Sequence, residues 1–121
     1  MSKAYQIIPA EPLEPRVILE AVRALGARQD GRELVLTATR VAVDELDEEY
    51  HDLGLDEWPY DVLIEVMVWV VGAPGVANRE VRRVFDLVCG MTSRDVLLTW
   101  EHSDVVGHRR NRHIEMDPAL T

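Results

Sequence analysis

The chain has 121 residues, of which 22 are acidic and 13 are Lys or Arg, giving a formal net charge of −9. This length predicts a single domain, residues 1–121, which can bury one core without metals. Cys89 is the one cysteine, so no intrachain disulfide can form. The longest apolar run, residues 66–71, is too short to cross a bilayer, and the N-terminus lacks the features of a secretory signal. We therefore expect a cytoplasmic protein that does not enter a membrane.

The first part of the chain predicts a strand, a helix and a long second strand. Residues 3–8 have the apolar character of a strand, and a stiff proline-rich connection follows. A helix is expected over residues 14–25, because Pro15 suits a first helical turn and Gly26 a C-terminal cap. Its predicted apolar stripe is Val17, Ala21, Val22 and Leu25. A turn at Asp30-Gly31 then leads into one strand over residues 33–43.

The second part of the chain repeats this alternation. Residues 61–71 are apolar on both faces, which indicates a central strand, and turn residues follow at 72–75. Asn78 is a suitable N-cap for a helix over 79–89, which Gly90 should end. Two further strands are predicted at 95–102 and 108–116, separated by a turn. The helix has a buried stripe and a solvent-facing side: the stripe is Val81, Val84, Phe85 and Val88, and the solvent-facing residues are Arg79, Glu80, Arg82, Arg83 and Asp86.

The predicted order of elements is β-α-β-β-α-β-β. Two helices with single apolar stripes can cover one face of a sheet of four to five mainly antiparallel strands, which is an α+β two-layer sandwich. A ferredoxin-like core with an added strand is the specific arrangement that we expect, and a split βαβ arrangement would fit the same order.

Residues 44–61 form an acidic segment between two predicted strands. This segment holds nine acidic residues and no Lys or Arg, whereas the remainder has 13 acids and 13 bases. We expect it to be mainly loop, because it contains Gly54 and Pro59. The predicted partner-binding residues are Asp44, Glu45, Asp47, Glu48, Glu49, Asp52, Asp56, Glu57, Trp58, Tyr60 and Asp61.

Concentrated negative charge indicates a basic protein as partner, since opposite fields speed encounter. Nucleic acid is not expected as a partner, because phosphate contacts require a basic surface. Trp58 and Tyr60 flank Pro59 and would anchor an interface, since aromatic residues dominate binding hot spots. Two alternatives stay open: the charge only keeps the protein in solution, and Trp58 packs onto the core.

No pattern in the chain predicts a catalytic residue, a metal site or a cofactor. An EF-hand that starts at Asp47 would place Asp52 where that loop requires Gly. His102, Ser103 and Asp104 are the residue types of a catalytic triad, but consecutive residues cannot form the relay. Cys89 follows an apolar helical stripe, which favours a buried structural side chain over a nucleophile.

Three histidines and three arginines lie near the C-terminus. His102, His108 and His113 lack the spacing of a known zinc signature, and His108 and His113 would face opposite sides of one strand. Arg109, Arg110 and Arg112 form a short basic cluster that could touch phosphate or pair with the acidic segment of the same or a second copy. No role is assigned to this hairpin from the sequence.

The second half of the chain resembles small immunity proteins of bacterial polymorphic toxin systems. The similar features are a helix with Glu80 and Arg83, a strand at residues 95–98, and a final strand with Arg109 or Arg110. Val88 stands where such proteins usually have Leu, and the first half matches only in its β-α-β order.

This resemblance implies a non-enzymatic inhibitor that binds a cognate toxin and blocks its active site or assembly. Many such toxins are cationic nucleases, and an acidic loop suits their inhibition because it mimics phosphate. The alternative is a small self-associating structural or phage accessory protein without catalytic activity. The protein would be a monomer or a homodimer. An enzyme with a pocket lined by His102, Glu101 or Glu65 is the third hypothesis.

Overall fold

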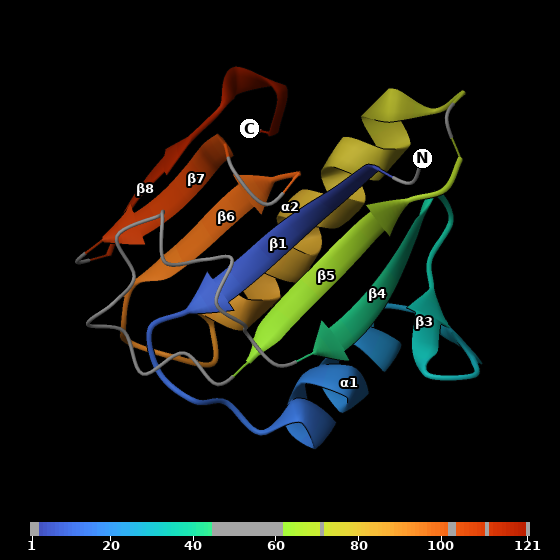
Figure 1. Cartoon of the computed structure of the whole chain (residues 1–121), viewed down its shortest axis with the longest axis horizontal. Coiled ribbons are helices and arrows are strands. Elements are labelled where there is room, and N and C mark those ends of the chain that lie inside the picture. The colour runs from blue at the N-terminus through green and yellow to red at the C-terminus, as the bar shows by residue number, and fades with distance from the viewer. Residues whose placement is uncertain (1–2, 45–61, 71, 102–103, 111, 121) are drawn as a thin grey trace.

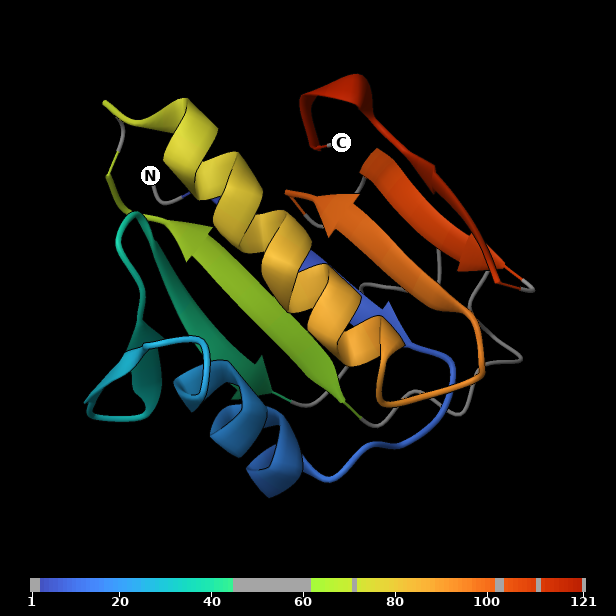
Figure 2. The ribbon, with the colours of Figure 1, turned by 180° about the vertical axis from the view of Figure 1, so that it is seen from behind.

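A single antiparallel sheet with two helices on one face makes up the described part of the chain (Figures 1 and 2). The computed structural model describes residues 3–44, 62–70, 72–101, 104–110 and 112–120. Within these residues the elements are β1 (Lys3–Pro9), α1 (Pro15–Arg23), β2 (Arg28–Asp30), β3 (Glu33–Val35), β4 (Thr39–Asp44), β5 (Leu63–Val68), α2 (Pro74–Cys89), β6 (Val96–Trp100), β7 (Asp104–Arg110), β8 (His113–Met116) and η2 (Pro118–Leu120).

The strand order across the sheet is β2-β3-β4-β5-β1-β6-β7-β8. The α+β class, the antiparallel sheet and the placement of both helices on one face are confirmed (Figure 2). The predicted count of four to five strands is too low, because the described residues form eight, and the ferredoxin-like order is not matched exactly. The additional strands come from a hairpin at each edge of the sheet, β2–β3 and β7–β8.

The core lies between the sheet and α2. The predicted stripe of Val81, Val84, Phe85 and Val88 is fully buried against inward-facing strand residues such as Ile7, Ile64, Val66 and Leu98. Helical spacing placed these four side chains on one face, and burial of that much apolar surface is the main stabilising term.

The stripe of α1 was predicted wrongly at Val17, which is 51% exposed. Ile18 and Val22 are the buried residues of this helix. The two positions are four apart and share one face, so the helix is rotated toward Ile18, while the predicted Val22 stays on the buried side. The contacts of α1 with α2, β3 and β4 fix this rotation.

Three predicted element boundaries differ from the structure. α2 begins at Pro74 rather than at residue 79, because proline is tolerated in a first helical turn. The predicted strand over 33–43 is split into β3 and β4, which pair with each other across residues 36–38. The predicted strand over 108–116 is likewise split, and Arg112 has a left-handed φ of 71° between β7 and β8.

β5 is central, as predicted, because it pairs with β4 on one side and β1 on the other. Successive side chains of each strand point alternately to the core and to the opposite face of the sheet. That opposite face is remote from the helices and is called here the open face. It carries buried side chains that include Gln6, Ile8, Leu97 and Thr99. The Thr99 hydroxyl donates to Gln6 Oε1 at 2.8 Å, so polar groups on this face are paired within the sheet. In the described part, no helix has the length and apolar character needed to cross a membrane.

Candidate functional site

The acidic segment is rooted in two neighbouring central strands. Asp44, the last residue of β4, is paired in register with Leu63, the first residue of β5. Asp44 is exposed and is the one predicted partner-binding residue that the structure describes. The other predicted positions lie outside the described residues: Glu45, Asp47, Glu48, Glu49, Asp52, Asp56, Glu57, Trp58, Tyr60 and Asp61.

Both roots of the segment lie at one end of the sheet. β4 ends and β5 begins at that end, where β1 also ends and β7 turns into β8 (Figure 1). Since β4 and β5 share a continuous register from Thr39↔Val68 to Asp44↔Leu63, the described strands pair fully up to the point where the segment departs.

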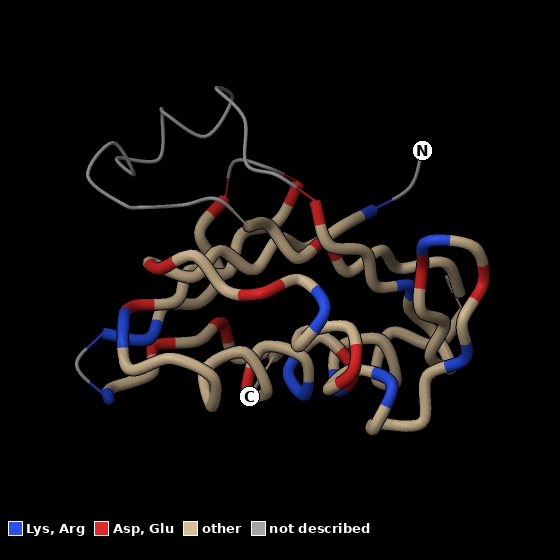
Figure 3. The backbone as a smooth tube through the Cα atoms, turned by 90° about the horizontal axis from the view of Figure 1, so that it is seen from below, with Lys and Arg blue, Asp and Glu red and all other residues tan. Residues whose placement is uncertain are grey.

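The charge of the described residues is nearly balanced. Eight of the 22 acidic residues fall within 45–61, so the rest of the chain has 14 acids against 13 Lys and Arg. Figure 3 shows acidic and basic positions interspersed along the described backbone. The net negative charge of the chain is therefore a property of the acidic segment.

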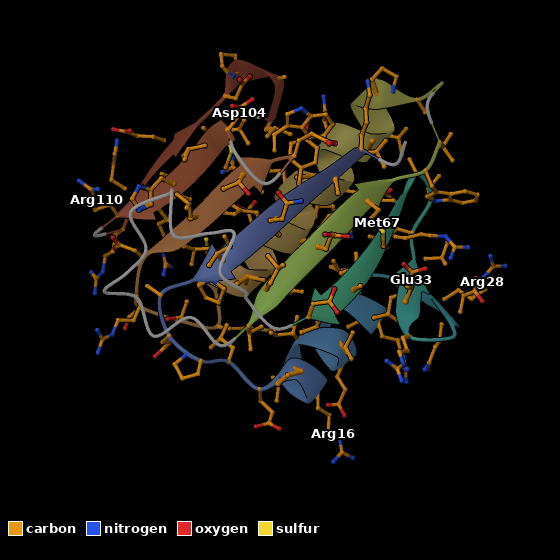
Figure 4. The ribbon with its side chains drawn as sticks, in the orientation of Figure 1. Arg16, Arg28, Glu33, Met67, Asp104 and Arg110 are labelled. Atoms are coloured by element: carbon orange, nitrogen blue, oxygen red, sulfur yellow. The ribbon has the colours of Figure 1, made fainter. Side chains whose placement is uncertain are left out.

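A second cluster lies on the hairpin of β7 and β8. The register pairs His108 with Glu115 and Arg110 with His113, so all four side chains share the open face. The prediction that His108 and His113 face opposite sides is wrong, because the turn places them on two paired strands. These four residues line a hollow of about 370 Å³, and Arg110 is at the edge of the sheet in Figure 4.

Carboxylates lie near the His and Arg side chains of this hairpin. Asp95 Oδ2 lies 3.5 Å from His108 Nε2 and 4.0 Å from Arg110 Nε. His113 Nε2 lies 4.0 Å from Glu115 Oε1. Among the described residues, no group of three His, Cys, Asp or Glu side chains could hold a metal ion. Of the triad-like residues, Asp104 is described and exposed, whereas His102 and Ser103 lie outside the described residues.

Arg109 has a structural contact that the sequence did not indicate. Its guanidinium donates to the carbonyl of Cys89 at 2.6 Å, to that of Thr92 at 2.7 Å, and also to that of Arg94. These carbonyls belong to the end of α2 and the loop after it, and a cation is favourable at a helix C-terminus. Arg109 therefore faces the helix layer and is not part of an exposed basic cluster. The alternation of strand residues separates it from His108 and Arg110.

Glu80 is buried, which corrects its predicted place on the solvent-facing side of α2. Its carboxylate accepts hydrogen bonds from the backbone N–H of Thr37 at 2.9 Å and of Ala38 at 2.7 Å. The Thr39 hydroxyl donates to the same group at 3.1 Å. The signal that could have indicated this burial is spacing, since Glu80 lies three residues after Ala77 and four before Val84, both of which are buried.

Cys89 is buried at the end of α2, as predicted. Burial, with a smaller contribution from Asp86, raises the pKa of its thiol to about 11 against the opposing effect of Arg109. The thiol is therefore protonated at neutral pH, and a protonated thiol is a poor nucleophile. Glu101, at the end of β6, accepts a hydrogen bond from the backbone N–H of Ala4 at 3.0 Å, which gives this carboxylate a structural contact.

Comparison with protein-family models gives no match, and neither the curated proteins nor the solved structures contain a significant match to the chain.

Proposed function

We propose that this protein is a non-enzymatic binding module, of the immunity type, that neutralises a cationic toxin through its acidic segment, residues 44–61. The observation that carries the proposal is that the net negative charge lies in one segment and not in the sheet and helices. The described sheet and helices are almost neutral, whereas the segment rooted between β4 and β5 holds nine acids without Lys or Arg. A field confined to one segment favours a single, oriented approach by a basic partner.

The framework also supports this proposal energetically. The stabilising contacts of the described part are the apolar core beneath α2, the Glu80 contacts and the Arg109 contacts. None of these contacts uses a side chain of the acidic segment. These contacts join described residues to one another, and we expect replacement of the acids to leave them packed. Trp58 and Tyr60 are the proposed anchors, since buried aromatic side chains supply much of the energy of protein interfaces.

A ferredoxin-like core is the finer structural proposal. The four central strands follow the order β4-β5-β1-β6, and α1 and α2 are the two connections that cross between them. The two edge hairpins would then be additions that widen this core.

Capture from a lysate of the source cells tests the function. The native protein is immobilised beside a variant with D47N, E48Q, E49Q and D56N, and retained proteins are identified by mass spectrometry. We expect the native protein to retain a basic protein at physiological salt. The variant should retain at most roughly one tenth of that amount, because it lacks the charges that steer and contact the partner.

A matched variant separates the position of charge from its amount. E14Q, E20Q, D86N and D104N remove four exposed acids outside the acidic segment, so the net charge changes equally. This control should retain the basic protein as the native chain does. Equal retention by all three proteins, or retention of no basic protein by any of them, would contradict the proposal.

A further inference from the structure

The last strand of the sheet, β8, has an outward-facing edge. Among the described strands β8 pairs with β7 alone. The N–H of Asp117 donates to the carbonyl of Val106 at 2.8 Å, so these two positions form a hydrogen-bonded pair. Hydrogen-bonded and non-hydrogen-bonded pairs alternate in an antiparallel ladder, so His113 and Glu115 also direct their backbone groups toward β7. Ile114 and Met116 therefore direct their N–H and C=O groups away from the sheet.

The side chains of β8 alternate between two chemically different faces. Ile114 and Met116 are half-buried on the helix side, where both pack against the core. His113 and Glu115 stand on the open face with side chains 76% and 81% exposed. The edge thus presents apolar residues on one face and one imidazole and one carboxylate on the other.

We propose that β8 is a self-association edge, on which a second copy of this chain adds its own β8 antiparallel about a two-fold axis at Ile114. In this register Ile114 lies opposite Ile114 of the second copy, and their outward N–H and C=O groups bond to each other. His113 then lies opposite Glu115 of the second copy, and the two-fold axis repeats the pair. Two imidazole–carboxylate pairs form on the open face, and an apolar pair forms on the helix side.

The charge of Glu115 favours this register over the register that is centred on Glu115. Moving the two-fold axis to Glu115 would also allow backbone pairing, but it would place the two Glu115 side chains directly opposite each other. Like charges at opposed positions destabilise a strand pair, whereas opposite charges stabilise it. The arrangement of His113, Ile114 and Glu115 therefore favours the pairing centred on Ile114 over the pairing centred on Glu115.

The other edge of the sheet is less suited to such pairing. β2 has three residues, and Asp30 and Glu33 flank the two-residue turn that joins it to β3. Only the middle residue, Gln29, then directs its backbone outward. Its side chain is already bonded to Arg23 and to the carbonyl of Gly31. β8 is longer and has two outward-facing residues, so we place the contact there. This inference does not depend on the proposed function.

Sedimentation velocity over a concentration series tests whether two copies associate through β8. The native protein should show a concentration-dependent dimer. I114P removes the outward N–H of Ile114 but none of the bonds to β7, and proline is tolerated in edge strands. It should remain folded by circular dichroism and sediment as a monomer. A native protein that stays monomeric, or an I114P dimer as stable as the native one, would overturn the proposal.

Charge variants test the register of the two β8 strands. They also test the proposed dimer if I114P fails to fold. H113E opposes Glu to Glu at both pairs, so the dimer dissociation constant should rise by about tenfold or more. H113E/E115K places Lys opposite Glu at both pairs and should restore the native constant, while H113K should keep or lower it. An unchanged constant in H113E, or no recovery in the double variant, would exclude this register. All of these side chains are exposed, and the acidic segment is intact, so capture of a basic protein should be unaffected.

Discussion

The two halves of the sheet are joined to α2 by charged side chains of opposite sign. On the β2–β3–β4 half, Glu80 of α2 reaches to the turn before β4 and accepts bonds from N–H and hydroxyl groups. On the β6–β7–β8 half, Arg109 of β7 reaches to the end of α2 and donates to carbonyls. In each case the sign of the side chain matches the backbone groups that would otherwise lack a partner.

This difference shows that the backbone, rather than a charge partner, determines which side chain anchors α2 at each place. A turn that presents N–H groups requires an anion, and the last turn of a helix presents carbonyls that favour a cation. The hairpins beyond these anchors differ as well. Arg40 of β4 holds β2 and β3 by ion pairs to Asp30 and Glu33, whereas β8 packs on β7 through Met116 over Gly107. Figure 4 places Arg28 and Glu33 at one edge and Arg110 at the other.

Removing the Glu80 anchor should have the largest effect on stability. E80A leaves the N–H groups of Thr37 and Ala38 and the hydroxyl of Thr39 without their acceptor, and we expect a loss of about 3 kcal/mol. E80Q keeps the shape and one acceptor oxygen, so it should lose less. Urea denaturation of both variants measures this, and a loss below about 1 kcal/mol in E80A would mean that the anchor is not needed.

Removing the Arg109 anchor should cost about 2 kcal/mol, because one guanidinium serves several carbonyls and the end of α2. R109K should recover only part of that free energy, since an ammonium cannot reproduce the planar set of donors. R110A is the matched control, because the Arg110 side chain is 72% exposed. Equal unfolding free energies for R109A and R110A would contradict the assigned contacts.

The packing of β8 on β7 should be the next most sensitive feature. A Cβ at Gly107 would lie 2.5 Å from Met116 Sδ and 3.3 Å from Leu98 Cβ. G107A should therefore cost about 1–2 kcal/mol through overpacking. Truncation of the thioether makes room, so the same substitution should cost less in an M116A background. A double-mutant cycle measures this coupling, and a value near zero would show that the close approach is relieved elsewhere.

The Arg40 ion pairs should contribute least to the free energy of unfolding. Arg40 lies 2.9 Å from Asp30 and 3.0 Å from Glu33, and its guanidinium carbon is 5.5 Å from the centroid of the Trp69 ring. Because the group is partly exposed, R40A should cost less than G107A. The cost should shrink as salt is added, whereas the G107A cost should not. A salt-independent R40A effect would indicate packing on Trp69 as the dominant contribution.

Cys89 adds a pH dependence at the end of α2. The pKa of its thiol is about 11 in the folded chain, raised first by burial from the ordinary value of 9.0. The unfolded thiol therefore ionises first, and the unfolded state binds fewer protons between these values. Stability should fall as pH rises through that window and should fall less in C89A. Parallel denaturation curves for the two proteins from pH 8 to pH 11 would contradict the raised pKa.

The spacing of apolar residues predicted the elements that have one clearly buried face. The stripe from Val81 to Val88 and the central position of β5 follow from apolar spacing alone, because the core-facing residues of both elements are buried. Val17 and Ile18 could not be ranked in this way, since Val17 shares a helical face with Ala21 and Ile18 shares one with Val22, and the spacing fits both. The split between β3 and β4 was missed because residues 36–38 contain neither Gly nor Pro.

The Glu80 and Arg109 contacts could not be predicted, since the partners are backbone groups that meet these side chains only in the tertiary fold. Glu80 and Thr37 are 43 residues apart, and Arg109 and Cys89 are 20 apart. The hairpin turn at Arg112 could not be predicted for the same reason. Its left-handed backbone reverses the chain, so that histidines before and after it lie on one face of two paired strands. The charge of the acidic segment, in contrast, is visible in the sequence, and its use as a binding surface stays a prediction.

The affinity for the captured basic partner, measured at a series of salt concentrations, tests the central claim most directly. The native protein and E14Q/E20Q/D86N/D104N should bind tightly at low salt and lose affinity steeply as salt rises, because the contacts of the acidic segment are screened. D47N/E48Q/E49Q/D56N should bind more weakly and with a flatter salt dependence. Identical affinity and salt dependence for the native chain and this last variant would show that the acidic segment is not the binding surface.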